Sequence, residues 1–100
     1  MAKRRIFCDG RELVLLYNTK NGEESLNLSR SEIASIQFGK YIERKFFFFK
    51  VQTEKIEIKP SKKPFSIVYT KSRAKEFFER YKEELASFAK DNRVTFHNNL

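Results

Sequence analysis

The sequence predicts a single α+β domain over residues 1–100, mainly β, with about seven antiparallel strands over residues 4–70 and one amphipathic helix over residues 72–90. Three observations support this fold class. Short alternations of apolar and polar residues, separated by turn signals, fill the first two thirds of the chain. Apolar spacings of three and four appear only near the end. A chain of 100 residues can bury only one core.

The first strands are separated by two tight-turn signals. Asp9-Gly10 and Asn21-Gly22 are dipeptides that readily adopt the positive φ of a hairpin turn. Alternating residues on both sides of these signals predict strands at residues 4–8, 12–17 and 24–28. We therefore expect a three-stranded antiparallel meander.

A capping-box spacing follows the meander. The Ser29 hydroxyl precedes the Glu32 carboxylate by three residues, the pattern that starts a helix. The next residues are too few and too β-branched for a long helix, so we expect one helical turn that leads into a strand. Gly39 permits a bend or bulge in that strand. Its expected inward row is Ala34, Ile36 and Phe38.

The next strands are predicted at residues 43–51, 55–59 and 65–70. The first of them contains four consecutive phenylalanines at residues 46–49. Successive side chains of a strand point to opposite faces, so two of these rings should enter the core. The other two then need cover from the helix, a second subunit or a ligand. Residues 60–64 form a rigid basic loop that a proline closes at each end.

The final helix is predicted to begin after Ser72 as its N-cap. The tail at residues 91–100 can add a short edge strand or extend freely. One apolar stripe at helical spacing contains Ala74, Phe77, Phe78, Tyr81, Leu85, Phe88 and Ala89.

This order of elements resembles the pleckstrin-homology-like fold, and more narrowly its small stand-alone bacterial members. Residues 26–36 look like the strand–turn–strand passage of those proteins, and residues 65–69 with 74–78 look like their last strand and capping helix. The resemblance covers roughly residues 4–90. It implies a partly open barrel of antiparallel strands, capped at one end by the C-terminal amphipathic helix.

The resemblance does not extend to inositol-lipid binding. The phosphoinositide-binding members of the family present clustered Lys and Arg residues on their first hairpin loop. The corresponding loop here is only Asp9-Gly10-Arg11, which is too short to surround a phosphorylated ring and carries an acid. Because one fold supports many functions, the partner must be inferred from surface residues.

Chemistry-bearing residues are scarce. The chain has one cysteine, Cys8, and one histidine, His97, which excludes a disulfide framework and gives too few ligands for a closed zinc site. A catalytic thiolate needs an activating base or cation, and His97 lies in the distant tail. With three glycines there is also no phosphate-binding glycine loop. We expect a protein with no enzymatic activity, cofactor, metal or small-molecule substrate.

The net charge of +8 is concentrated in the predicted sheet and the basic loop, because the helical segment is neutral. The simplest interpretation is a solvated surface. The functional alternative is a surface for an anionic partner such as nucleic acid. Anionic lipid headgroups are a weaker alternative, since residues 60–64 contain no hydrophobic anchor. The candidate residues are Arg4, Arg5, Arg44, Lys45, Lys50, Lys62 and Lys63.

The aromatic run suggests a protein contact. Phe47 and Phe49 are the candidate self-association surface, since strand aromatics that do not enter the core commonly form subunit interfaces. The leading hypothesis is a protein-interaction or assembly module that binds a protein partner or forms a homo-oligomer. The apolar run after the basic N-terminus is too short for a signal peptide, and the unpaired Cys8 suits a reducing compartment. We therefore expect a cytoplasmic location.

Overall fold

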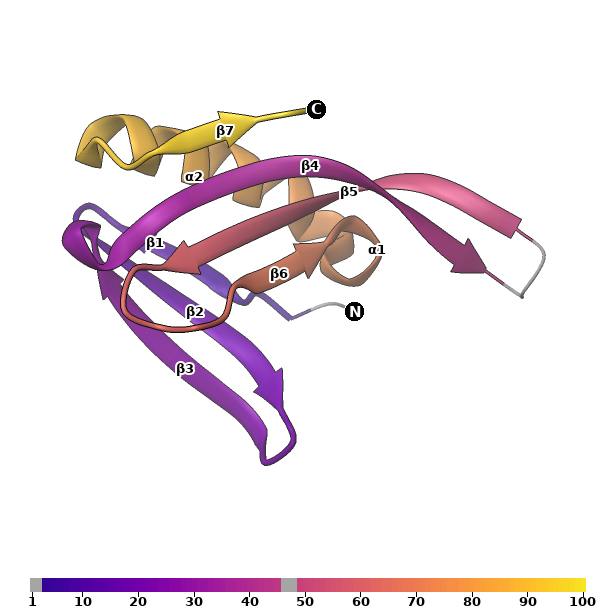
Figure 1. Ribbon diagram of the computed structural model, residues 1–100, viewed down its shortest axis with the longest axis horizontal. Coiled ribbons are helices and arrows are strands. Elements are labelled where there is room, and N and C mark those ends of the chain that lie inside the picture. Colours follow the sequence, from indigo (N-terminus) through magenta and orange to yellow (C-terminus); the bar gives the residue numbers. More distant parts are fainter. Residues whose placement is uncertain (1–2, 46–48) are drawn as a thin grey trace.

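The computed structural model describes residues 3–45 and 49–100 (Figure 1). Within these residues the chain has the α+β composition expected, with seven strands in two sheets and one long helix near the C-terminus. The strand order is β1-β2-β3 in the first sheet and β6-β5-β4-β7 in the second.

The first sheet is the expected antiparallel meander. It consists of β1 (Ile6–Asp9), β2 (Glu12–Thr19) and β3 (Gly22–Ser29). Gly10 and Gly22 adopt positive φ values of 31° and 109° at the two turns. The turn dipeptides therefore set this part of the topology locally.

The capping box forms as predicted. The Ser29 backbone N–H donates to Glu32 Oε1 at 3.0 Å, and the 3₁₀ turn η1 (Arg30–Glu32) leads into β4 (Ile33–Lys45). The expected inward position of Ala34 was wrong. A register shift between Ile33 and Ser35 buries Ile33 and leaves Ala34 exposed, so the irregularity lies there and not at Gly39.

The strands predicted at residues 43–51 and 55–59 were wrong in their boundaries. β4 ends at Lys45 and the antiparallel β5 (Phe49–Pro60) begins with Phe49 opposite it, so residues 43–51 are not one strand. The strand expected at residues 55–59 is the continuation of β5. Six strands precede the helix, of which the last is β6 (Ile67–Thr70). The seventh is β7 (Phe96–Asn98) in the tail, and it pairs parallel to β4.

The predicted helix forms in three parts, namely α1 (Lys71–Ala74), the 3₁₀ turn η2 (Lys75–Phe77) and α2 (Phe78–Asn92). The N-cap prediction was wrong, because the N-cap is Thr70 and Ser72 lies inside α1. The Ser72 hydroxyl instead donates to Glu43 Oε1 at 3.3 Å. The break between α1 and η2 coincides with a positive φ of 51° at Lys75.

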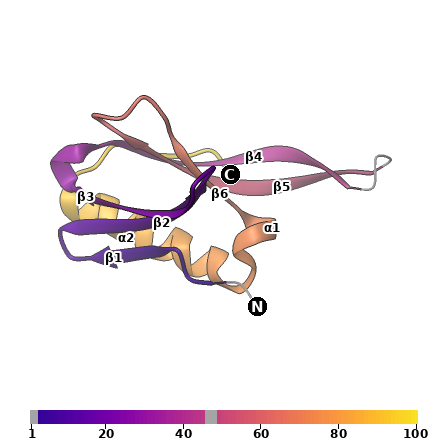
Figure 2. The same ribbon diagram turned by 90° about the horizontal axis from the view of Figure 1, so that it is seen from below.

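The core lies where the two sheets and α2 meet. α2 contacts β1 of the first sheet and β4 of the second, and so connects them (Figures 1 and 2). Burial of one large apolar side chain in this core contributes about 1.5–3 kcal/mol to the free energy of unfolding. In the described residues the two sheets are separate and form no closed barrel. The largest fully buried side chains include Ile6, Leu13, Leu15, Ile36, Ile56, Ile58, Phe78, Tyr81 and Leu85.

Candidate functional site

A two-stranded ribbon projects from the body of the molecule (Figures 1 and 2). It consists of residues 41–45 of β4 and 49–53 of β5, which we call the hairpin arm. β7 pairs only with residues 36–38 of β4, and β6 pairs only with residues 55–58 of β5. Within the described part of the chain, both outer edges of the hairpin arm therefore have no strand partner.

The hairpin arm carries large apolar side chains in solvent. Ile42 is 65% exposed, Phe49 63% and Val51 41%. Residues directly opposite each other in an antiparallel pair share a face. Glu43 lies opposite Val51, whereas Arg44 lies opposite Lys50 on the other face. One face of the hairpin arm thus carries Phe49 and Val51, and the other carries Arg44 and Lys50 together with Ile42.

The structure describes only one of the two residues of the candidate self-association surface. Phe47 lies outside the described residues. Phe49 begins β5, is exposed and is not one of the core residues. Among the described residues, Phe49 is therefore a large apolar side chain that the core does not cover.

The candidate basic residues near the N-terminus are engaged in ion pairs. An Arg4 Nη donates to Glu84 Oε2 at 2.7 Å, which ties the start of the chain to α2. Arg5 pairs with Glu23 at 3.0 Å, and Lys3 pairs with the same carboxylate. These contacts give Arg4 and Arg5 a structural role.

The remaining candidates occupy the two ends of β5. Arg44 and Lys50 lie opposite each other in the hairpin arm, and Lys45 ends β4 beside them. Lys62 and Lys63 are exposed in the loop after Pro60. β5 has 12 residues and spans roughly 35–40 Å at a normal strand rise. The seven candidates therefore form three groups, and the two groups at opposite ends of β5 are too far apart to act as one small site.

A groove of about 910 Å³ opens between the two sheets. We call it the β6 groove, because the whole of β6 lines it together with residues 16–19 of β2 and residues 72–74 after β6. Sequence reasoning missed this groove. The contributing segments lie about fifty residues apart in the chain, and only the relative position of the two sheets brings them together. Their tyrosines, Tyr17 and Tyr69, were the only signal in the sequence.

Two buried tyrosines form the base of the β6 groove. Tyr69 Oη donates to the Leu16 carbonyl at 2.8 Å, and the Arg5 backbone N–H donates to Tyr81 Oη at 2.6 Å. Burial raises the pKa of the Tyr69 phenol well above its ordinary value, and the neighbouring Tyr81 adds to this shift. Both hydroxyls are already hydrogen-bonded, so the base is fixed in shape.

The isolated cysteine and histidine remain apart. Burial raises the pKa of the Cys8 thiol to about 11, and the Glu84 carboxylate contributes to the shift, so Cys8 is protonated at neutral pH. His97 lies in β7 and is exposed. Across residues 3–45 and 49–100, no three His, Cys, Asp or Glu side chains gather closely enough to hold a metal ion.

The fold, the hairpin arm and the β6 groove together define the class of protein, namely an α+β domain with a projecting hairpin and an open groove between its sheets. Comparison of the chain with protein-family models, curated proteins and solved structures gave no significant match. None of the helices in the described residues is long and apolar enough to cross a membrane.

Proposed function

We propose that this protein is a non-enzymatic protein-interaction or assembly module that self-associates through the hairpin arm. One observation carries the proposal, namely that the arm is a two-stranded ribbon with two unpartnered edges and with Ile42, Phe49 and Val51 exposed. An isolated ribbon of this kind is marginally stable in water. Free strand edges and exposed apolar patches both favour association.

We also propose a pleckstrin-homology-like architecture, a partly open barrel capped by the helix. The order of the elements supports it, with an antiparallel meander, a second antiparallel group of strands and then an amphipathic helix that contacts both sheets. The open side would correspond to the β6 groove. A reducing, cytoplasmic location is part of the same proposal, because Cys8 is the single cysteine of the chain.

The simplest assembly is a twofold pair of arms, in which identical edges face each other. The face with Phe49 and Val51 suits such a contact better than the opposite face, where Arg44 and Lys50 of two copies would repel each other. Apolar contact is insensitive to screening, and salt weakens repulsion between the basic residues. Association should therefore persist, or strengthen, as salt is raised.

Size-exclusion chromatography with light scattering tests the proposal at about 0.1 M and about 0.5 M NaCl. We expect a dimer or larger species at both concentrations. The double variant Phe49→Thr/Val51→Thr keeps β propensity but removes the apolar contact, and it should be monomeric. Phe7→Thr, at an exposed phenylalanine of β1, is the matched control and should leave the oligomer intact. A monomeric wild-type protein at both salt concentrations would contradict self-association.

Nucleic-acid binding is a second candidate, favoured by the basic face of the arm. Among the described residues neither Arg44 nor Lys50 forms an ion pair, and both are exposed on the same face of the arm. Unpaired basic residues can hold the phosphates of a nucleic acid. A monomer that carries nucleic acid at low salt, releases it at high salt and loses it in Arg44→Gln/Lys50→Gln would favour this function over assembly.

A further inference from the structure

The backbone of β6 faces the β6 groove. All four consecutive residues of β6 line it, although alternate side chains of a strand point to opposite faces. This pattern is expected of a cavity that runs along the strand's edge, where the backbone N–H and C=O groups point. β6 pairs with β5 on its other side and ends its sheet.

The opposite wall of the groove is also a strand edge. Residues 16–19 of β2 line it consecutively. β1 pairs with β2 only as far as Leu15, and the Leu16 N–H then donates to the Arg5 carbonyl at 2.8 Å. Beyond this bond, β2 keeps only β3 as a partner in the described residues. The groove therefore lies where the two sheets fail to meet, between two unpaired edges.

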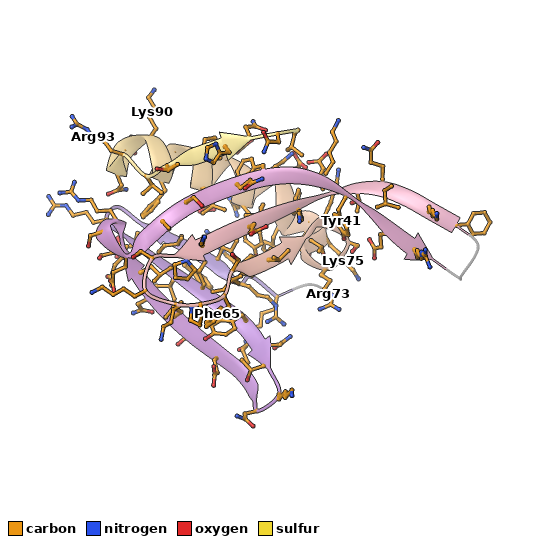
Figure 3. All side chains as sticks on the ribbon, viewed as in Figure 1. Tyr41, Phe65, Arg73, Lys75, Lys90 and Arg93 are labelled. Atoms are coloured by element: carbon orange, nitrogen blue, oxygen red, sulfur yellow. The ribbon has the colours of Figure 1, made fainter. Side chains whose placement is uncertain are left out.

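The two ends of the groove differ in chemistry. Phe65 and Tyr17 pack at one end with ring centroids 6.1 Å apart, and Phe65 and Val68 remain 41% and 48% exposed. Arg73 and Tyr41 lie at the other end (Figure 3). In the part of the chain that is described, Arg73 has no ion-pair partner. The groove thus offers an apolar contact, a strand edge and then a cation.

We propose that the β6 groove binds an extended peptide segment of a partner protein, which adds to β6 as a strand. Main-chain hydrogen bonds to β6 would hold the segment. An apolar side chain would lie on Phe65 and Tyr17, and a carboxylate would pair with Arg73. The net charge of +8 attracts an acidic segment in general. This site is separate from the hairpin arm, and the inference does not depend on self-association.

A peptide suits the groove better than a nucleic acid. Glu24 and Glu43 also line it, and both carboxylates are held in place by hydroxyl donors, Tyr17 at 3.3 Å for Glu24 and Ser72 at 3.3 Å for Glu43. Two fixed carboxylates would repel a phosphate backbone. A peptide strand supplies backbone N–H groups and needs only one acidic residue. The volume of about 910 Å³ lies within the range of known ligand sites.

Selection from a displayed library of random peptides about seven residues long, slightly longer than a typical strand, tests the proposal on the full chain. We expect enriched peptides to combine alternating apolar residues with an acidic one. The best peptide, synthesised with a fluorescent label, should bind the Phe65→Ala and Arg73→Glu variants about tenfold or more weakly by anisotropy. The matched controls Phe7→Ala and Arg80→Glu change exposed residues outside the groove and should leave affinity within about twofold.

Hydrogen exchange gives a second readout that does not depend on the variants. Bound peptide should slow exchange of backbone amides in β6 and in residues 17–19. Failure to enrich any peptide, equal affinity for Phe65→Ala and the wild type, or unchanged exchange in β6 would overturn the proposal. So would binding of labelled oligothymidylate that Arg73→Glu abolishes, which would assign the groove to nucleic acid. If Phe65→Ala converted an oligomer to a monomer, the occupant of the groove would be a second copy of this protein.

Discussion

Two residues hold backbone conformations that favour glycine. Lys75 has φ 51° and ψ −120° where α1 passes into η2, and Arg93 has φ 55° and ψ 39° directly after α2. Both lie on the surface (Figure 3). A residue with a Cβ is strained in this half of φ space, and the position after a helix is where glycine is most common. Neither strained position is visible in the sequence, since lysine and arginine are ordinary helix residues.

Relief of this strain is our residue-scale prediction. Lys75→Gly and Arg93→Gly should each stabilise the fold by about 0.5–1 kcal/mol, because the loss of backbone strain exceeds the added entropy of the unfolded chain. For a domain of this size each should raise the Tm by roughly 2–8 °C, measured by circular dichroism. Lys75→Ala keeps the Cβ and should give no such increase. A lower Tm for both glycine variants would show that the positive φ values are not strained.

At the scale of elements, a cluster of ion pairs joins β5 to the helical segment just below the hairpin arm. Lys82 of α2 donates to Glu54 of β5 at 2.8 Å and also pairs with Glu79 at 3.1 Å. Lys71 reaches the same Glu54 carboxylate at 3.9 Å. The hydrogen bond from Lys82 lowers the pKa of Glu54 below its usual value, and the charges of Lys82, Lys71 and Lys40 act in the same direction.

This cluster predicts a pH dependence of stability. Because the folded-state pKa of Glu54 is lowered, its contribution is complete above the unfolded value, near 4.5, and disappears as the pH falls through the folded value. Glu54→Gln should destabilise the protein by about 0.5–1 kcal/mol at pH 7, a modest amount because these side chains reach solvent. In urea titrations the difference from wild type should shrink as the pH falls below about 4.5 and be smallest near about pH 2, where the folded-state carboxylate is becoming protonated.

The matched control for this prediction is Glu57→Gln. Glu57 lies on the same strand, and its ion pair with Lys55 is long, at 3.8 Å. That variant should change stability little at either pH. A Glu54→Gln effect of equal size at pH 7 and at low pH would show that the loss comes from packing and not from charge.

At the scale of the whole molecule, few polar contacts join the two sheets. Tyr69 of the second sheet donates to the Leu16 carbonyl of the first, and this bond lies at the base of the β6 groove. α2 supplies the other connection through its contacts with β1 and β4. The position of the sheets, and therefore the shape of the groove, depends on this junction.

Removal of one hydroxyl tests the junction. Tyr69→Phe leaves the partly buried Leu16 carbonyl without this donor and should cost about 1–2 kcal/mol, seen as a lower urea midpoint with an unchanged m-value. Tyr17→Phe removes an exposed hydroxyl 3.3 Å from Glu24 and should cost much less. Equal effects of the two substitutions would mean that the Tyr69 bond does not contribute to the junction.

The candidate surfaces could be predicted only in part. The sequence showed that the aromatic run needed cover, and Phe49 is indeed exposed. It did not show that Arg4 and Arg5 would be neutralised by Glu84 and Glu23, which are distant in the chain. Nor did it show the β6 groove, which depends on the juxtaposition of strand edges. Such features depend on long-range pairing, and no local pattern specifies it.

The sequence by itself determined the local parts of this protein. Asp9-Gly10 and Asn21-Gly22 set the meander, Ser29 with Glu32 set the 3₁₀ turn, and the apolar stripe set the buried face of α2. Each of these acts between residues a few positions apart. Only the tertiary structure decided the long β4–β5 hairpin, the parallel pairing of β7 and the gap between the sheets. Those features depend on which distant strands pack together and bury their apolar side chains away from water. This packing involves the whole chain, so no local segment determines it.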